Sequence, residues 1–453
     1  MRAQTWYGRP GRQRPVALLA LAGIGLAMVA FVAAGPWMIA RYDFAAFIPG
    51  IVASGVLTIA ATMLAPCVQT RAGLLVILGL AVVMRLLVIG DDPFLSTDIY
   101  RYVWDGRVQA AGINPYALVP ADPALASLRD AAIFPNINRA DYAVTAYPPA
   151  AQAFFLAVTR IAETLVMMRL AMVACEVVII AVMIDLLRQL RLPTTAVVAW
   201  AWHPLAIWEI AQGGHVDALM VALLMLGVWL LVRNRAIAGA VLVTLAALVK
   251  PYAVLALPSF WRPWDWRVPA AFVATIVLCY LPYLGVGGGV LGFVTPAGYL
   301  GEEGLVDGEG FWLVALVRSL LGNLPGLPIA YLLAAAGMMA WLGVRAAWRT
   351  DRTAETTLQD IAVLLMAGLF ALSPSYAWYF LAVVPFVVLG GGAPAWAMTL
   401  AAPLLYRPLG LPENELAWKT LAMLPFVMAT ASTLLRGRGA RLAQHQGASR
   451  WTT

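Results

Sequence analysis

Apolar stretches long enough to cross a bilayer recur from Val16 to the C-terminal region of the chain. A hydrocarbon core about 30 Å thick needs roughly 20 apolar residues for each helical crossing. Of the 453 residues, 62% are hydrophobic and 12% are charged, whereas soluble domains are about 45–50% apolar and about 25% charged. Because a backbone in lipid must satisfy its own hydrogen bonds, the pattern predicts an all-α fold: a polytopic transmembrane helical bundle forming a single domain, residues 1–453.

Arginines between the apolar stretches predict the topology. Alternate connections carry arginines if the basic N-terminus, with Arg2, Arg9, Arg12 and Arg14, is cytoplasmic. The pattern holds only if residues 236–260 enter and leave on one side, as two half-helices that meet near Lys250. About twelve crossings plus this re-entrant pair result, with both termini cytoplasmic, in the inner or plasma membrane. The arginines on the cytoplasmic side are Arg71, Arg188, Arg191, Arg233, Arg235, Arg262, Arg267, Arg345, Arg349, Arg352, Arg436, Arg438 and Arg441.

The basic N-terminus followed by the apolar residues 16–34 resembles a signal peptide. The apolar run is long and many spans follow it, so an uncleaved first helix is expected. The formal net charge of +7 arises from short, scattered basic segments, which argues against a nucleic-acid partner. The three cysteines, Cys67, Cys175 and Cys279, lie in apolar stretches without paired or metal-ligand spacing, so we expect neither a disulfide framework nor a cofactor, and a divalent metal is possible but not indicated.

Two long connections are expected on the non-cytoplasmic face: a first loop, residues 91–163, and a second loop, residues 285–325. The first loop begins with the polar and aromatic sequence DIYRYVWDGR, residues 98–107. If Thr97 caps a short helix, then Asp98, Arg101, Tyr102 and Asp105 share one helical face. This spacing predicts a carboxylate beside a guanidinium and a phenol at the membrane surface.

The residue types of the first loop suit glycosyl or phosphate chemistry. Asp98 is a candidate general base for a hydroxyl group. Arg101 and Arg107 are candidates for binding a phosphate or holding a carboxylate, and Trp104 offers a flat face for a sugar ring. The alternative is an interfacial aromatic belt with a surface ion pair between Arg101 and Asp105.

A second polar group is expected where two spans meet, at Gly213, Gly214, His215 and Asp217. A bend at the two glycines would point both polar side chains at the cavity beside the first loop. The alternative is a helix-linking turn with polar caps. Metal binding by His203, His215 and Asp217 has no supporting motif spacing.

Lys250 is one of only two lysines and lies within an apolar stretch. A cation at the outer tip of a broken helix pair suits the phosphate of a lipid headgroup, and the alternative is a lysine that snorkels to the interface. Tyr147 and Tyr379 lie in turns on the same face and are compatible with substrate binding or with an aromatic belt.

The remaining acidic residues are interpreted as structural. Glu302, Glu303, Asp307 and Glu309 lie among glycines of the second loop, which predicts a solvated flexible loop or lid rather than an acid/base pair. Glu176 and Asp185 lie in or at the end of an apolar stretch and are expected to pack or to cap.

The polar and aromatic motifs together predict the substrate-binding residues. Substrate contacts are expected from ten of them, which are Arg101, Tyr102, Trp104, Asp105, Arg107, Tyr147, His215, Asp217, Lys250 and Tyr379.

Taken together, these motifs resemble the GT-C superfamily of membrane glycosyltransferases, in particular bacterial mannosyltransferases that use polyprenyl-phosphate mannose. The resembling stretches are residues 98–107, Asn114-Pro-Tyr116, Tyr147-Pro-Pro149, His203-Pro, Gly213-Gly-His-Val-Asp217, Lys250-Pro-Tyr252, Ser373-Pro and Trp378-Tyr379. One departure is that the first loop follows three spans, whereas a single span is usual in that family.

The resemblance implies that Asp98 is the catalytic base. It also implies a polyprenyl-phosphate sugar donor carrying a hexose, with mannose as the expected sugar, a glycan or glycolipid acceptor on the non-cytoplasmic face, and inversion at the anomeric carbon. A transporter or flippase of a lipid-linked or polar solute is the alternative from another class; it predicts inverted repeats and polar sites at the midplane, whereas the polar groups here gather at one face. A non-catalytic scaffold is a further alternative.

Overall fold

The computed structural model describes residues 15–42, 44–406 and 415–449, with the side chains of residues 42, 45 and 437–449 excepted. Every regular element in these ranges is helical, which confirms the predicted all-α fold. The arginines of residues 1–14 and the side chains of Arg438 and Arg441, which the topology prediction used, lie outside the described residues.

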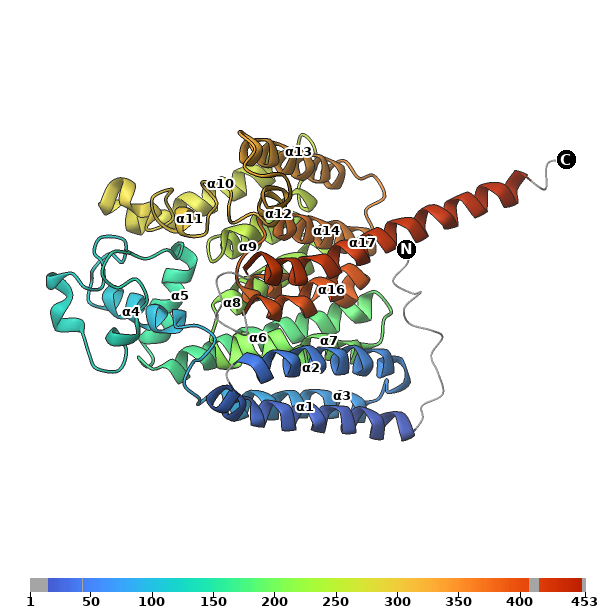
Figure 1. Ribbon diagram of the computed structural model, residues 1–453, viewed down its shortest axis with the longest axis horizontal. Coiled ribbons are helices and arrows are strands. Elements are labelled where there is room, and N and C mark those ends of the chain that lie inside the picture. Colours follow the sequence, from blue (N-terminus) through green and yellow to red (C-terminus); the bar gives the residue numbers. More distant parts are fainter. Residues whose placement is uncertain (1–14, 43, 407–414, 450–453) are drawn as a thin grey trace.

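Three long helices form one side of the bundle: α1 (Pro15–Tyr42), α2 (Phe44–Leu64) and α3 (Arg71–Val88). Helix α1 packs against both α2 and α3, and the three lie side by side in blue in Figure 1. The short helix η2 (Ala65–Cys67) joins α2 to α3. The side chain of Thr70 accepts the backbone N–H of Gly73 at 2.9 Å and caps α3, which is how a threonine satisfies an otherwise unpaired donor at a helix start.

The first loop forms a separate cap at one end of the bundle. It contains α4 (Asp98–Ala110), η3 (Pro123–Leu128), η4 (Phe134–Asn136) and α5 (Pro149–Thr159), and α4 packs against α5. In Figure 1 these helices lie at the opposite end of the molecule from the start of α1. The chain then returns through the bundle in α6 (Leu165–Gln189).

Short helices fill the centre of the bundle: η5 (Thr194–Val197), α7 (Val198–Ala201), η6 (Ala206–Gln212), α8 (Asp217–Val232), α9 (Ala236–Ala247) and η7 (Pro251–Ser259). The indoles of Trp200, Trp202 and Trp208 are buried there. Glu176 forms a buried ion pair with Arg85 at 2.5 Å and accepts the indole N–H of Trp200 at 3.0 Å, as expected of a packing residue.

Two predicted breaks are confirmed. Helices η6 and α8 are bent by 119°, and the bend contains Gly214 at φ +69°, a conformation in which a side chain is strained. A Cβ at Gly214 would also collide with the side chain of Ile99 in α4, so this glycine lets the bend approach the first loop closely. Residues 236–260 form two short helices, α9 and η7, which meet at Lys250 and pack against each other.

The remaining helices complete the other side of the bundle. Among them α10, α13, α14 and α17 are the long ones. In chain order they are α10 (Arg267–Tyr280), η8 (Leu281–Leu291), α11 (Tyr299–Glu302), α12 (Trp312–Leu321), α13 (Leu327–Ala347), α14 (Ala354–Leu372), η9 (Ala377–Val383), α15 (Phe386–Leu389), α16 (Gly392–Ala401), η10 (Ala402–Tyr406) and α17 (Glu415–Ser449).

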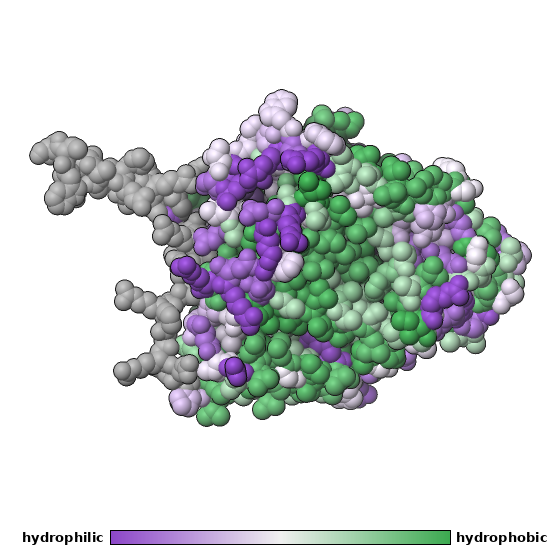
Figure 2. Space-filling model, turned by 180° about the vertical axis from the view of Figure 1, so that it is seen from behind, coloured by the Kyte–Doolittle hydropathy of each residue, from purple (hydrophilic) through white to green (hydrophobic). Residues whose placement is uncertain are grey.

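Eight helices within the described ranges are long and apolar enough to span a membrane, or nine if the bent pair η6–α8 is one span. The expected count of about twelve crossings is therefore not confirmed, because the apolar stretches 195–212, 376–390 and 393–406 form only short helices. Figure 2 shows a broad apolar belt between two hydrophilic ends. Such a belt is the surface that lipid covers in a membrane protein.

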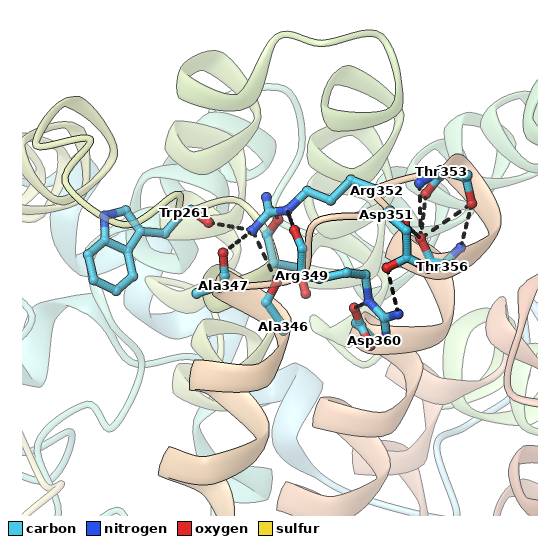
Figure 3. Close-up of polar contacts among 10 residues, drawn as sticks. Trp261, Ala346, Ala347, Arg349, Asp351, Arg352, Thr353, Thr356 and Asp360 are labelled. Atoms are coloured by element: carbon cyan, nitrogen blue, oxygen red, sulfur yellow. Dashed lines mark hydrogen bonds and ion pairs between the residues drawn. The ribbon is translucent and has the colours of Figure 1, made fainter.

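Polar contacts hold the turn between α13 and α14 (Figure 3). Arg352 donates to the backbone carbonyls of Ala347 at 2.6 Å and Trp261 at 2.8 Å. Arg349 forms a two-bond pair with Asp360 at 2.5 and 2.7 Å. Of the arginines used to predict topology, Arg352 therefore joins the segment at the end of η7 to this turn, and Arg349 joins the turn to α14.

Candidate active site

A cavity of about 460 Å³ lies where the first loop meets the bundle. Its walls come from four parts of the chain. These are the first loop, through the start of α4 and the irregular residues 138–148, the Lys250 corner, the second loop and the turn before η9. Of the residues predicted as functional, Asp98, Arg101, Tyr147, Lys250 and Tyr379 line it. The fold thus brings together the first loop, the Lys250 corner and the turn that carries Tyr379, which the sequence placed on one face.

Asp98 begins α4, and two side chains hold its carboxylate. Oδ1 accepts from Nδ2 of Asn138 at 2.8 Å, and Oδ2 accepts from the hydroxyl of Tyr147 at 3.1 Å. The backbone N–H of Asp98 donates to Oγ of Ser96 at 3.1 Å. Thr97 occupies the capping position but makes no side-chain capping bond.

The surroundings of Asp98 favour its ionised form. Burial raises the pKa of this carboxyl, but the electrostatic effects of His215 and Lys250, with the two hydrogen bonds from Asn138 and Tyr147, outweigh burial and hold the pKa below its ordinary value. Burial, followed by the charge of Asp98, raises the pKa of the Tyr147 phenol well above its usual value. The phenol therefore keeps its proton and donates to a carboxylate at neutral pH.

Lys250 lies at the tip between α9 and η7 and is only 9% exposed. Its Nζ is 3.6 Å from Oδ2 of Asp217, and it lies 5.4 Å and 5.3 Å from the ring centroids of Tyr147 and Tyr379. The hydroxyl of Tyr252 donates to the other oxygen of Asp217 at 2.7 Å. Lys250 is thus a cation held in place by one carboxylate and two aromatic faces, on the same cavity wall as Tyr147.

The 213–217 corner lies behind the cavity wall rather than in it. His215 is buried, stacks on Trp378 at 4.2 Å, and has its Nε2 3.4 Å from Oε2 of Glu209. Asp217 is buried and contacts two residues that line the cavity, Lys250 and Tyr252. The expectation that both residues point into one cavity is therefore corrected: each contacts a residue that lines it. Within the described part of the chain, no three His, Cys, Asp or Glu side chains are grouped as a metal site.

Arg101 lines the cavity, whereas its partner Asp105 lies beneath it. Nε of Arg101 is 2.7 Å from Oδ1 of Asp105, with side chains 6% and 2% exposed. Nη1 of Arg101 donates to the carbonyl of Ala143 at 3.0 Å, and Gln152 donates to Asp105 at 3.0 Å. The alternative of a surface ion pair is therefore wrong, because the pair is buried and fixes Arg101 to the frame of the first loop.

Three of the residues predicted to bind substrate lie away from the cavity. Tyr102 is buried and stacks on Phe155 at 4.6 Å. Trp104 is buried and packs against Phe134 at 5.6 Å. Arg107 forms ion pairs of 2.7 Å with two acidic side chains of the first loop. These side chains are part of the loop's framework because α4 is covered on most sides by the rest of the loop.

The sequence offered no signal for several residues of the site. Asn138 and Arg139 lie in irregular backbone, and Arg139 has a positive φ of 57°. Nε of Arg139 is 2.6 Å from Oε2 of Glu302, and the hydroxyls of Tyr299 and Tyr379 are 2.6 Å apart. The second loop therefore closes one side of the cavity through specific contacts, where the sequence predicted a solvated loop or lid.

Comparison with known proteins gives a family for this arrangement. Residues 6–264 match the family described as Alpha-(1->6)-mannopyranosyltransferase, N-terminal domain. The chain is also 27% identical over 358 residues to Alpha-(1->6)-mannopyranosyltransferase A of Mycobacterium tuberculosis, an alignment that covers 69% of this chain and 62% of that relative. The matched part of this chain thus corresponds to less than two thirds of the relative's length. No solved structure gives a significant match.

Proposed function

Because this chain belongs to the alpha-(1->6)-mannopyranosyltransferase family, we propose that it is a membrane glycosyltransferase that moves mannose from a polyprenyl-phosphate donor to a glycan or glycolipid acceptor. The supporting observation is the carboxylate of Asp98, held by Asn138 and Tyr147 in the cavity wall that also carries Lys250. The first loop, Lys250 and the second loop meet at one hydrophilic end of the apolar belt, which supports catalysis at the non-cytoplasmic face.

In the proposed reaction Asp98 acts as the general base. An acceptor hydroxyl oxygen forms a bond to the anomeric carbon while its proton passes to the Asp98 carboxylate, and the bond between that carbon and the phosphate oxygen breaks. Attack from the side opposite the phosphate inverts the anomeric carbon. An α-linked product, as the relative's name describes, would then require a β-linked donor.

Lys250 is proposed to stabilise the departing phosphate. The polyprenyl phosphate gains negative charge as it leaves, and a fixed cation in a partly desolvated site stabilises that charge. Arg101 is a second candidate because it lines the same cavity, whereas the ion pairs of Arg107 direct it elsewhere. The apolar lining residues Val249, Val294 and Leu372 favour entry of the first isoprene units, with the rest of the tail in the surrounding lipid.

Asp98→Asn in proteoliposomes tests the base. With polyprenyl-phosphate mannose and an α-1,6-linked mannose oligosaccharide, we expect release of polyprenyl phosphate to fall by roughly 10²–10⁴-fold, the range that general bases contribute. Donor binding should persist because the amide keeps the shape of the side chain. Asp141→Asn is the matched control, since Asp141 is an exposed residue of the same loop that does not line the cavity. Near-normal turnover of Asp98→Asn would exclude this residue as the base.

A further inference from the structure

A second cavity, of about 940 Å³, adjoins the first. The two share Leu95, Tyr376 and Trp378 as lining residues. The rings of Tyr376 and Trp378 are stacked with centroids 4.3 Å apart. The ring of Trp378 also stacks on that of His215, with centroids 4.2 Å apart. The shared wall is therefore an aromatic partition braced from behind by the buried corner.

The second cavity reaches close to Asp98. Leu95 lines both cavities, and Asp98 follows it by three residues, so their Cα atoms are at most about 11 Å apart. That span is of the order of one or two sugar rings. This distance is short enough for the end group of a sugar chain in the second cavity to reach Asp98.

The lining of the second cavity combines carboxylates with aromatic rings. Glu302, Glu303 and Glu309 come from the second loop, and Phe94 from the segment after α3. Trp378 is buried, and its indole N–H has no hydrogen-bond partner within the described structure. Carboxylates accept from sugar hydroxyls, and aromatic faces and indole N–H groups suit sugar rings.

Charge narrows the class of ligand. The cavity carries four carboxylates, the fourth being that of Glu415, against the cations of Arg318 and Lys419. Arg139, which pairs with Glu302 from outside the lining, adds a third cation. The four carboxylates still leave the net charge negative, which disfavours an anionic ligand through like-charge repulsion. The first cavity instead presents Lys250 and Arg101, which suit a phosphate. The two cavities thus differ in the charge of ligand that each accommodates.

We propose that the second cavity is the acceptor site and that it binds a neutral oligosaccharide, whose terminal hydroxyl passes the Tyr376–Trp378 partition to reach Asp98. This inference rests on the proposed glycosyl transfer. It separates the two substrates: the anionic donor occupies the first cavity, and an uncharged sugar chain occupies the second. The volume of about 940 Å³ is near the top of the range of about 300–1,000 Å³ usual for ligand pockets, so the site accommodates more than one sugar.

Ala315→Trp tests the location. Ala315 of α12 lines the second cavity only, and an indole there should raise the KM for a neutral mannose trisaccharide at least 10-fold while leaving the donor KM unchanged. Leu320→Trp is the matched control because Leu320 lies on the same helix, is exposed and lines neither cavity. An unchanged acceptor KM in Ala315→Trp would overturn the proposal.

Glu303→Gln is a second variant with little change in shape. Wild-type protein should use the neutral trisaccharide at least 10-fold better, in kcat/KM, than the same trisaccharide carrying a phosphate, and Glu303→Gln should narrow that preference. A wild-type preference for the phosphorylated acceptor would overturn the proposed charge selection. Failure of the proposed function is distinguishable, because wild-type protein would then transfer mannose to neither acceptor.

Discussion

The two loops that enclose the candidate active site are anchored differently. In the first loop the Arg101–Asp105 pair is nearly inaccessible, with side chains 6% and 2% exposed, and Gln152 adds a further buried bond. The second loop is attached by Arg139 and Glu302, whose side chains are 27% and 30% exposed. A buried pair is costly to break, whereas an exposed pair contributes little. The proposed base thus lies on the loop that a buried ion pair holds, whereas the ion pair that joins the second loop to it is partly exposed.

Asp105→Ala should have the largest effect because it leaves the Arg101 guanidinium unpaired in a buried position. We expect a loss of about 3–5 kcal/mol in the free energy of unfolding and loss of transfer activity, measured by thermal unfolding in detergent and by mannose transfer. Glu163→Ala, which removes a 41% exposed partner of Arg107, should cost no more than about 1 kcal/mol. Equal losses in the two variants would show that the first loop is not anchored at Asp105.

Lys250 lies between the two loops, over Tyr147 of the first and over Tyr379, which contacts Tyr299 of the second. Lys250→Met combined with Asp217→Asn removes both charges, so that no buried carboxylate is left unpaired. We expect the donor KM to rise roughly 10- to 100-fold, as for loss of a hydrogen bond to a charged group. Lys250→Arg should restore most donor binding, and a normal donor KM in the double variant would exclude Lys250 from the phosphate site.

Tyr147→Phe removes one of the bonds that lower the pKa of Asp98. The pKa should rise toward the ordinary value of about 3.9, so the acidic limb of the profile of kcat/KM against pH should move to higher pH. A carboxyl with a lowered pKa in the folded state also contributes stability above its unfolded pKa, and that contribution disappears as pH falls through the folded pKa. The variant should therefore lose less stability on acidification than the wild type. An unmoved acidic limb would show that another group limits activity at low pH.

Glu302→Gln should have the smallest effect because its pair with Arg139 is partly exposed. We expect a change of at most about 1 kcal/mol in the free energy of unfolding and a change of a few-fold in the KM values, since the Tyr299–Tyr379 contact still holds the second loop. Raising the salt concentration should reduce the difference from wild type. A loss as large as that of Asp105→Ala would show that the two loops are equally anchored.

Local signals in the sequence were enough to predict the helical bundle, the bend at Gly213–Gly214, the paired short helices at Lys250 and the placement of Asp98 at a helix start. Each depends on neighbours within a few residues. The count of about twelve crossings is not confirmed, because hydropathy alone does not separate a full span from two short helices folded within the bundle, as η9 and α15 are.

The directions of the side chains on α4 could not be predicted from local signals in the sequence. Helical periodicity places Asp98, Arg101, Tyr102 and Asp105 on one face, but the first loop wraps around α4, so Tyr102 and Asp105 are buried and Asp98 and Arg101 face the cavity. Asn138 gave no signal because its bond to Asp98 joins residues 40 positions apart.

The sequence by itself determined that this chain is an apolar helical bundle with a polar, aromatic first loop, because hydropathy, helical period and glycine placement are local properties. Only the tertiary structure decided which polar groups share a cavity, that the second loop closes it, and that an acidic second cavity lies beyond Trp378. Those features arise from contacts between segments far apart in sequence, and their geometry is set by packing rather than by the residues' neighbours in the chain.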